Sequence, residues 1–159
     1  MKHNLKIVPT TILSEEEKAQ VFHLWNIQYP EKLSYENLAD FDEYLEKLTN
    51  FQHFLLVDNE NKISGWTLTF DREDESWFAI ILAEEIHGQG FGRRMLNHLK
   101  EHESILNGWV IDHDNDRKKN GELYKSPLKF YEKCGFEILT NERLELPKIS
   151  AVKIRWTKK

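Results

Sequence analysis

The pattern of apolar and polar positions divides the chain into short strands and amphipathic helices. LKIVP at 5–9 alternates and is short enough for a strand. Ser14 then begins a helical pattern that ends before Pro30, and Glu17 follows Ser14 at the spacing of a capping box. Apolar residues at spacings of three and four predict a second helix over 35–48. We expect both helices to lay one face on a sheet.

The middle of the chain predicts that sheet. Apolar segments at 51–58, 62–70 and 76–83 are joined by short polar turns, which favours antiparallel pairing. A helix over about 90–106 and a strand at 108–114 follow. A strand, a helix and a strand in succession make a right-handed crossover between parallel strands.

The last third of the chain predicts one more helix and two more strands. The helix covers 123–134 and ends at Gly135 in the position of a C-cap, and strands at 136–140 and 150–158 finish the chain. These elements predict an α+β fold with a mixed, mostly antiparallel sheet of about seven strands and about four flanking helices. A length of 159 residues suits a single domain over 1–159.

Composition and charge narrow the classes of function. The net charge of −5 comes from 27 acidic and 22 basic residues spread along the chain, so no basic face indicates a nucleic acid partner. No apolar run approaches the ~18 residues of a membrane span, and no signal peptide is evident. The single cysteine, Cys134, has no partner for a disulfide or a zinc cluster. We expect a cytoplasmic protein without a metal site, as a monomer or a homodimer.

The stretch EEIHGQGFGRRM at 84–95 carries the first candidate chemistry. Its alternate glycines, between an apolar strand and a helix, are Gly88, Gly90 and Gly92. Glycine lets the backbone approach a ligand, and the helix start directs unpaired N–H groups and a positive dipole to the same place. Such a turn suits phosphate or pyrophosphate, and we expect Arg93 and Arg94 to add positive charge.

Two other phosphate-binding motifs can be compared with this turn. A P-loop needs a Gly-Lys-Ser/Thr ending that is absent. A dinucleotide fingerprint needs G-x-G-x-x-G, and Arg93 stands at its sixth position, although Asp112 lies at the place of that motif's acidic residue. A turn in which the glycines serve only packing is the remaining alternative.

Two stretches together resemble the GNAT superfamily of N-acetyltransferases. HGQGFG places Gly90 and Gly92 where the family pattern Gln/Arg-x-x-Gly-x-Gly/Ala has its glycines. SPLKFYEKCGF at 126–136 is similar to the family's closing Ala-x-x-Phe-Tyr-x-x-x-Gly-Phe. The order of the two motifs, and the helix and strand between them, also match the family.

The resemblance implies a sheet that splays between 76–83 and 109–114, with the pantetheine arm of acetyl-CoA in the gap. The glycine turn would hold the pyrophosphate, and the main chain of the preceding strand would meet the pantetheine and the thioester. The implied cofactor residues are Ile80, Ile81, Leu82, His87, Gly88, Gln89, Gly90, Phe91, Gly92 and Arg93. Three positions depart from the family pattern. His87 stands where the family has Gln or Arg, Pro127 stands where it usually has alanine, and Tyr124 stands where it frequently has asparagine.

The same resemblance implies a general acid, Tyr131, which matches the tyrosine that protonates the departing thiolate. A purely structural aromatic at this position is the alternative. The base is less defined. The candidates on the predicted strand are Asp112 and Asp114 on one face and His113 on the other. Glu73 and Glu75, before the preceding strand, are further candidates.

The acceptor side would be walled by the first two helices, which makes Trp25, Tyr29 and Tyr35 candidates for the acceptor pocket. The resemblance therefore implies an N-acetyltransferase that moves an acetyl group from acetyl-CoA to a primary amine of a small molecule or protein, by direct attack in a ternary complex. The alternative is a non-catalytic acyl-CoA-binding or sensing module that keeps the anion cradle without an acid and a base.

Overall fold

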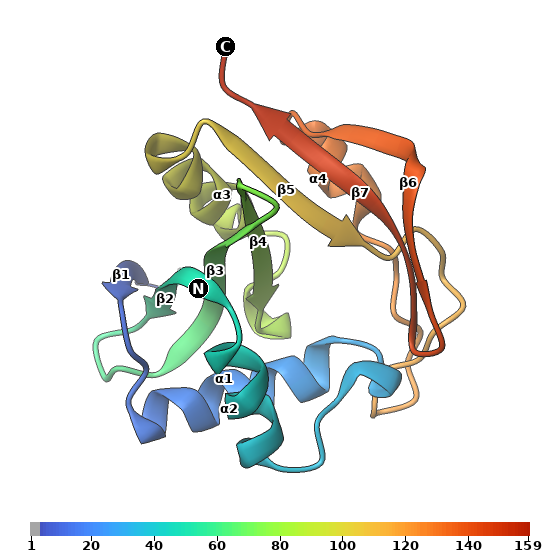
Figure 1. The fold of residues 1–159 in the computed structure, drawn as a ribbon. Coiled ribbons are helices and arrows are strands. Elements are labelled where there is room, and N and C mark those ends of the chain that lie inside the picture. The colour runs from blue at the N-terminus through green and yellow to red at the C-terminus, as the bar shows by residue number, and fades with distance from the viewer. Residues whose placement is uncertain (1–3) are drawn as a thin grey trace.

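Residues 4–159 are described by a computed structural model, in which seven strands form one sheet with helices on both faces (Figure 1). The α-helices are α1 (Glu15–Gln28), α2 (Leu38–Glu46), α3 (Phe91–His102) and α4 (Leu128–Lys133), with 3-10 turns η1 (Glu31–Leu33) and η2 (Glu84–Ile86). The strands are β1 (Lys6–Thr10), β2 (Thr49–Val57), β3 (Ile63–Arg72), β4 (Glu75–Leu82), β5 (Ile105–Val110), β6 (Glu137–Leu146) and β7 (Ile149–Thr157). The predicted α+β class and mixed sheet are confirmed.

The strand order is β1-β2-β3-β4-β5-β7-β6, and β4 and β5 are the one parallel pair. Alternate side chains of β4 enter two cores, because successive residues of a strand point to opposite faces. Trp77 and Ile81 pack with α1 and α2, whereas Phe78 packs with α3 and α4. α3 connects β4 to β5, and these two strands are parallel, so the predicted crossover is present.

Local capping explains where the first two helices begin. The Oγ of Ser14 accepts the N–H of Glu17 at 3.1 Å, and the Glu17 carboxylate accepts the N–H of Ser14 at 2.8 Å, so the predicted capping box is confirmed. The second helix is shorter than the predicted 35–48. The side chain of Asn37 accepts the N–H of Asp40 at 2.9 Å and starts α2 at the next residue.

Further predicted boundaries, of α3, β5 and α4, are wrong. α3 ends at His102, and β5 runs over Ile105–Val110 instead of 108–114, because Ile105 already pairs with Thr157 of β7. The apolar spacing of Leu99 and Leu106 fits a helix, but tertiary pairing overrides it. α4 begins only at Leu128, after Pro127. None of the helices within residues 4–159 is long and apolar enough to cross a membrane.

β4 and β5 separate soon after they meet. Their one paired position is Trp77 with Asn107, and the strands then diverge toward their C-terminal ends (Figure 1). The Asn107 side chain holds the closed end, since its Nδ2 donates to Glu75 Oε1 at 3.0 Å and to the Ser76 carbonyl at 3.2 Å. The sheet is therefore pinned at one end and open at the other.

Candidate functional site

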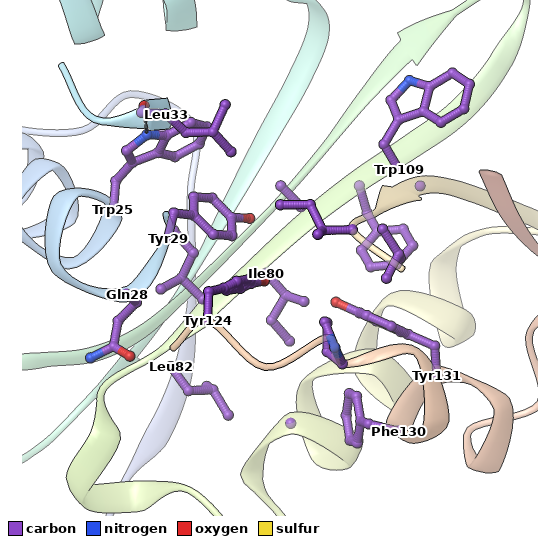
Figure 2. A pocket seen from close by; sticks show the side chains of 18 of the residues that line it. Trp25, Gln28, Tyr29, Leu33, Ile80, Leu82, Trp109, Tyr124, Phe130 and Tyr131 are labelled. Atoms are coloured by element: carbon purple, nitrogen blue, oxygen red, sulfur yellow. Dashed lines mark hydrogen bonds between the residues drawn. The ribbon is translucent and has the colours of Figure 1, made fainter. Parts of the chain in front are cut away.

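A cavity of about 1330 Å³ lies where β4 and β5 diverge. The glycine turn, the aromatic residues of α1 and α2, and α4 all contribute to its wall (Figure 2). Most of the residues singled out in the sequence line it, namely Trp25, Tyr29, Tyr35, Ile80, Ile81, Leu82, His87, Gly88, Gly90, Phe91, Gly92, Arg93 and Tyr131. Gln89, Asp112 and His113 are not among the lining residues. The fold thus gathers segments that lie about a hundred positions apart in the chain.

The glycine turn presents free backbone donors to this cavity. Gly88 has φ 75° and Gly90 has φ 88°, and a β-carbon at either position would meet no atom within 4 Å. The first helical hydrogen bond of α3 runs from the N–H of Arg94 to the carbonyl of Gly90 at 3.1 Å. The three preceding N–H groups, of residues 91–93, consequently have no partner inside the helix. An open concave turn with unpaired N–H groups fits a phosphate or pyrophosphate.

Side chains of the turn brace the turn itself. The His87 Nε2 lies 2.9 Å from the carbonyl oxygen of Leu82, across η2. The Gln89 Nε2 donates to the carbonyl of Glu85 at 3.0 Å. The side chains of His87 and Gln89 are therefore both engaged by main-chain carbonyls of this segment.

The two arginines after the glycines have separate roles. Arg93 lines the cavity and its Nη2 donates to the carbonyl of Lys133 at 3.3 Å, which ties α3 to α4. Arg94 turns away, because its Nη1 donates to the carbonyl of Leu5 at 3.1 Å. The expectation that both arginines add charge to the anion site is therefore wrong for Arg94.

β4 offers main-chain groups to the gap. Ala83, just beyond the strand, donates its N–H to the carbonyl of Ser64 at 2.8 Å. Inter-strand bonds alternate along an antiparallel pair, so the main-chain groups of Ile81 also face β3. Those of Ile80 and Leu82 consequently face the gap toward β5. An extended amide-containing ligand can pair with them there as an added strand would.

Tyr131 projects from α4 into the cavity (Figure 2). Its ring packs edge-on against Phe78 and Phe136, with ring centres 5.9 Å and 5.7 Å away. Burial raises the pKa of the Tyr131 phenol far above its usual value, with a smaller contribution from Tyr124. The phenol is therefore a neutral proton donor at physiological pH.

Tyr124 is a cavity residue to which the sequence assigned no role. Its ring meets that of Tyr29 at 6.4 Å and at right angles, and burial raises the pKa of Tyr124 to about 12. Tyr29 and Tyr131 point their hydroxyl groups into the cavity from opposite sides, with Tyr124 between them (Figure 2). The only signal in the sequence was the departure of Tyr124 from the family's asparagine.

The wall formed by α1 and α2 is held by hydrogen bonds across their connection. Trp25 Nε1 donates to the carbonyl of Leu33 at 2.8 Å. The Asn26 amide both donates to the carbonyl of Tyr35 and accepts its N–H, each at 2.9 Å. These bonds fix Trp25, Tyr29 and Tyr35 as one aromatic wall, with the Trp25 and Tyr29 rings 4.7 Å apart.

The predicted base candidates near the end of β5 lie outside the cavity lining. Asp112 forms a two-point ion pair with Arg143, at 2.8 Å and 3.0 Å, and the hydrogen bonds from Arg143 lower the pKa of Asp112. His113 Nδ1 accepts the N–H of Asn115 at 3.1 Å, and Asp114 accepts the N–H of Ser126 at 2.8 Å. The polar side chains of residues 112–114 thus hold the loop after β5 in place, which gives them a structural role.

The other two candidate bases are also separated from the cavity. Glu73 occupies the β3–β4 turn at φ 54°, and Glu75 is bound by Arg155 at 2.6 Å. Within the described part of the chain, the acidic side chains that line the cavity are Glu84 and Glu122. No motif in the sequence had indicated that either glutamate lines the cavity.

One cluster outside the cavity can hold a metal ion. His98, Glu101 and His102 on α3 each offer a ligand atom within 4.8 Å of the others. This cluster shares no residue with the cavity lining.

Comparisons with known proteins agree with this fold. The family model described as "Acetyltransferase (GNAT) domain" matches residues 50–138, which is more than half of the chain. An aminoglycoside 6'-N-acetyltransferase complexed with coenzyme A aligns with a TM-score of 0.71 at 15% identity, over 94% of this chain and 96% of that one. A spermidine N-acetyltransferase from Vibrio cholerae, in complex with CoA and spermine, aligns with a TM-score of 0.67 at 16% identity, over 96% and 95%. The search of curated protein sequences found no significant match.

Proposed function

Because the chain belongs to the GNAT family of acetyltransferases, which use acetyl-CoA as the acetyl donor, we propose that it acetylates a primary amine by direct attack in a ternary complex. The observation that carries this proposal is the cavity between β4 and β5, which joins an anion cradle, a neutral phenol and an aromatic compartment. The non-catalytic alternative is not favoured, because the phenol of Tyr131 lies inside the same cavity as the cradle.

The cradle for the pyrophosphate consists of main-chain N–H groups at the start of α3, with Arg93 beside them. The free main-chain groups of Ile80 and Leu82 hold the pantetheine arm and orient the thioester. Acetyl-CoA supplies the activated acetyl group and a thiolate as leaving group. The residues of the cradle and of β4 thus bind and orient, and they take no part in proton transfer.

Tyr131 is proposed as the general acid. Its raised pKa keeps the proton on the phenol until the thiolate leaves, and its position on α4 directs the hydroxyl into the cavity (Figure 2). Tyr29 and Tyr124 are neutral for the same reason, so neither accepts the proton of the amine. We therefore assign the removal of that proton to water in the cavity, and the same water returns a proton to the Tyr131 phenolate after the thiol has formed, so that the phenol is restored.

The activity is tested by thiol release from acetyl-CoA in the presence of a set of amines, together with acetyl-CoA binding measured by calorimetry. The proposal expects amine-dependent thiol release and formation of the N-acetyl product. Tight binding of acetyl-CoA without turnover of any amine would instead support the binding module. A cytoplasmic location and a monomeric or homodimeric state stay predictions from the sequence.

A further inference from the structure

The cavity carries a surplus of positive charge, although the chain as a whole has a net charge of −5. Its basic lining residues are Arg72, Arg93, Lys118, Lys125, Lys133 and Lys148. Its acidic lining residues within 4–159 are two, Glu84 and Glu122. None of these basic side chains forms an ion pair with a described residue, whereas basic residues such as Lys18, Lys32 and Arg155 elsewhere do. Within the described residues, the lining of the cavity therefore combines six basic side chains that have no ion-pair partner with only two acidic ones.

The phosphates of acetyl-CoA account only for the basic residues at the end of the cavity next to the glycine turn. Arg93 and Lys133 lie beside the glycine turn, joined by a hydrogen bond of 3.3 Å. Arg72 pairs with Glu75 at the far end of β4, seven residues before Leu82. At ~3.3 Å per residue this separation is about 23 Å. A phosphate held at the turn cannot contact Arg72.

Arg72 is held in place without a carboxylate. Its guanidinium carbon lies 5.0 Å from the ring centre of Phe70 and 4.9 Å from that of Trp77. Its carbonyl accepts the Nε1–H of Trp77 at 3.2 Å. Aromatic faces orient a guanidinium but leave the N–H groups at its edge free. Arg72 is thus an oriented cation with donors available to a ligand.

The charged neighbours of Arg72 either form ion pairs with other residues or lie in the exposed β3–β4 hairpin, where they border a separate, smaller hollow that Arg72 also touches. Glu75, its partner across the strands, is bound by Arg155 at 2.6 Å. Lys153, whose Nζ lies 5.2 Å from the ring centre of Trp77, pairs with Glu142 at 3.3 Å. The remaining acidic residues nearby, Asp71, Glu73 and Asp74, are exposed in the β3–β4 hairpin and form no ion pair among the described residues.

Two lysines extend the positive charge on the side of the cavity near α1. Lys118 belongs to the loop after β5, which is held against η1 by a bond of 2.8 Å from the Glu31 N–H to the Arg117 carbonyl. Lys148 lies in the β6–β7 turn. Glu122 lines the same side of the cavity, and the main-chain N–H of Lys118 donates to the Glu122 carbonyl at 2.9 Å. The compartment that receives the acceptor remains net positive.

We propose that the acceptor is an amine with an anionic group about 10 Å from its nitrogen, and that Arg72 binds this group. The proposal rests on the proposed acetyltransferase function. The span follows from the separation of three positions between Trp77, which packs against Arg72, and Ile80, at the thioester, at ~3.3 Å per position. The aromatic wall favours an apolar connection between the two ends. A polycation would instead be repelled by Arg72, Lys118 and Lys148.

The proposal is tested with amines of one chain length and three end groups. The compounds are 8-aminooctanoic acid, 8-amino-1-octanol and 1,8-diaminooctane, assayed by thiol release, and the tripeptide Gly-Phe-Gly with its C-terminal amide as a second pair. We expect kcat/KM for each carboxylate to exceed that for its neutral counterpart by about tenfold, since a charge-assisted hydrogen bond contributes about that much. A diamine that is acetylated as well as the carboxylate would overturn the proposal.

Variants then assign the effect to Arg72. In Arg72→Gln we expect the preference for the carboxylate over the alcohol to disappear, mainly through a higher KM for the carboxylate. Lys119→Gln is the matched control, because Lys119 is exposed, adjacent to Lys118 and outside the cavity lining. It should keep the preference. A preference that persists in Arg72→Gln contradicts the proposal.

A binding measurement separates this proposal from the proposed function. If no amine is turned over, quenching of tryptophan fluorescence in the CoA-bound protein still compares the carboxylate with the diamine, since Trp77 and Trp109 line the cavity. Selective binding of the carboxylate that is lost in Arg72→Gln supports the anion site even without turnover. Equal or weaker binding of the carboxylate than of the diamine overturns it.

Discussion

Gly92 and Phe130 approach so closely that no side chain fits at position 92, where a β-carbon would lie 2.9 Å from Phe130 Cζ. This contact joins the first turn of α3 to α4, and so joins the two motifs that identify the family in the sequence. Phe130 is followed by Tyr131, with the two rings 5.2 Å apart. The glycine that shapes the anion cradle therefore also sets the distance between the cradle and the proposed general acid.

Gly92→Ala should move α3 away from α4 or displace the Phe130 ring. We expect the free energy of unfolding to fall by about 1–3 kcal/mol, as is typical of overpacking in a core. Urea denaturation measures this loss. An alanine variant with unchanged stability would mean that the Gly92–Phe130 contact tolerates a methyl group.

Gly90→Val tests the cradle separately from backbone strain. Gly90 and Gly121 both have φ 88° and open space around the position of a β-carbon, but only Gly90 lines the cavity. Valine at either position should cost a similar strain energy of about 1–3 kcal/mol. Calorimetry should show acetyl-CoA affinity reduced by about tenfold or more in Gly90→Val and unchanged in Gly121→Val. Equal affinities in both variants would remove the turn from the cofactor site.

Tyr131→Phe removes the hydroxyl and keeps the ring that packs against Phe78 and Phe136. If the phenol protonates the leaving thiolate, kcat should fall by about a hundredfold, which is typical for the loss of a general acid. Acetyl-CoA affinity and thermal stability should change little, as measured by calorimetry and melting curves. A variant with wild-type kcat would show that Tyr131 is only a packing residue.

Asp112→Asn examines the residue that resembled a base in the sequence. Its carboxylate is bound by Arg143 and lies outside the cavity lining, so we expect kcat to stay within about twofold of wild type. The partly exposed ion pair should contribute no more than about 1 kcal/mol to stability. A large loss of kcat without a loss of stability would return Asp112 to the mechanism.

His53 should make the fold sensitive to acid. It is 2% exposed, its Nδ1 accepts the Nε1–H of Trp66 at 3.0 Å, and burial lowers the pKa of His53 to about 4. The unfolded chain, with an ordinary histidine pKa of about 6.5, binds the proton more readily than the folded one between these values. The stability due to His53 is therefore complete above about pH 6.5 and is lost as the pH falls toward 4.

Urea denaturation at pH 7 and pH 5 measures this effect. Wild type should lose about 2 kcal/mol more than His53→Gln over that range, because glutamine does not titrate. The two proteins are compared at the same ionic strength, so that the contributions of the other groups cancel. The same pH dependence in both would show that His53 is not the group responsible.

Elements with a local signal could be predicted from the sequence. The capping box at Ser14, the β3–β4 hairpin and the positive φ of Gly135, directly after the C-cap Cys134, depend on residues a few positions apart. The glycine turn is equally local, since both its positive φ angles and the free N–H groups after it arise within a few residues of Gly90. These features determine the fold class and the family.

The tertiary structure decided which charged and aromatic groups meet in the cavity. Asp112 and Arg143 are 31 positions apart, and their pairing turned a candidate base into an ion pair. Arg72, Tyr124 and the boundary between α3 and β5 were likewise set by partners distant in the chain. Periodicity reports which face of an element is buried, but it carries no information on which distant side chain will neutralise a charge. The sequence by itself therefore determined the scaffold and the glycine turn, and only packing decided which charged and aromatic groups line the cavity.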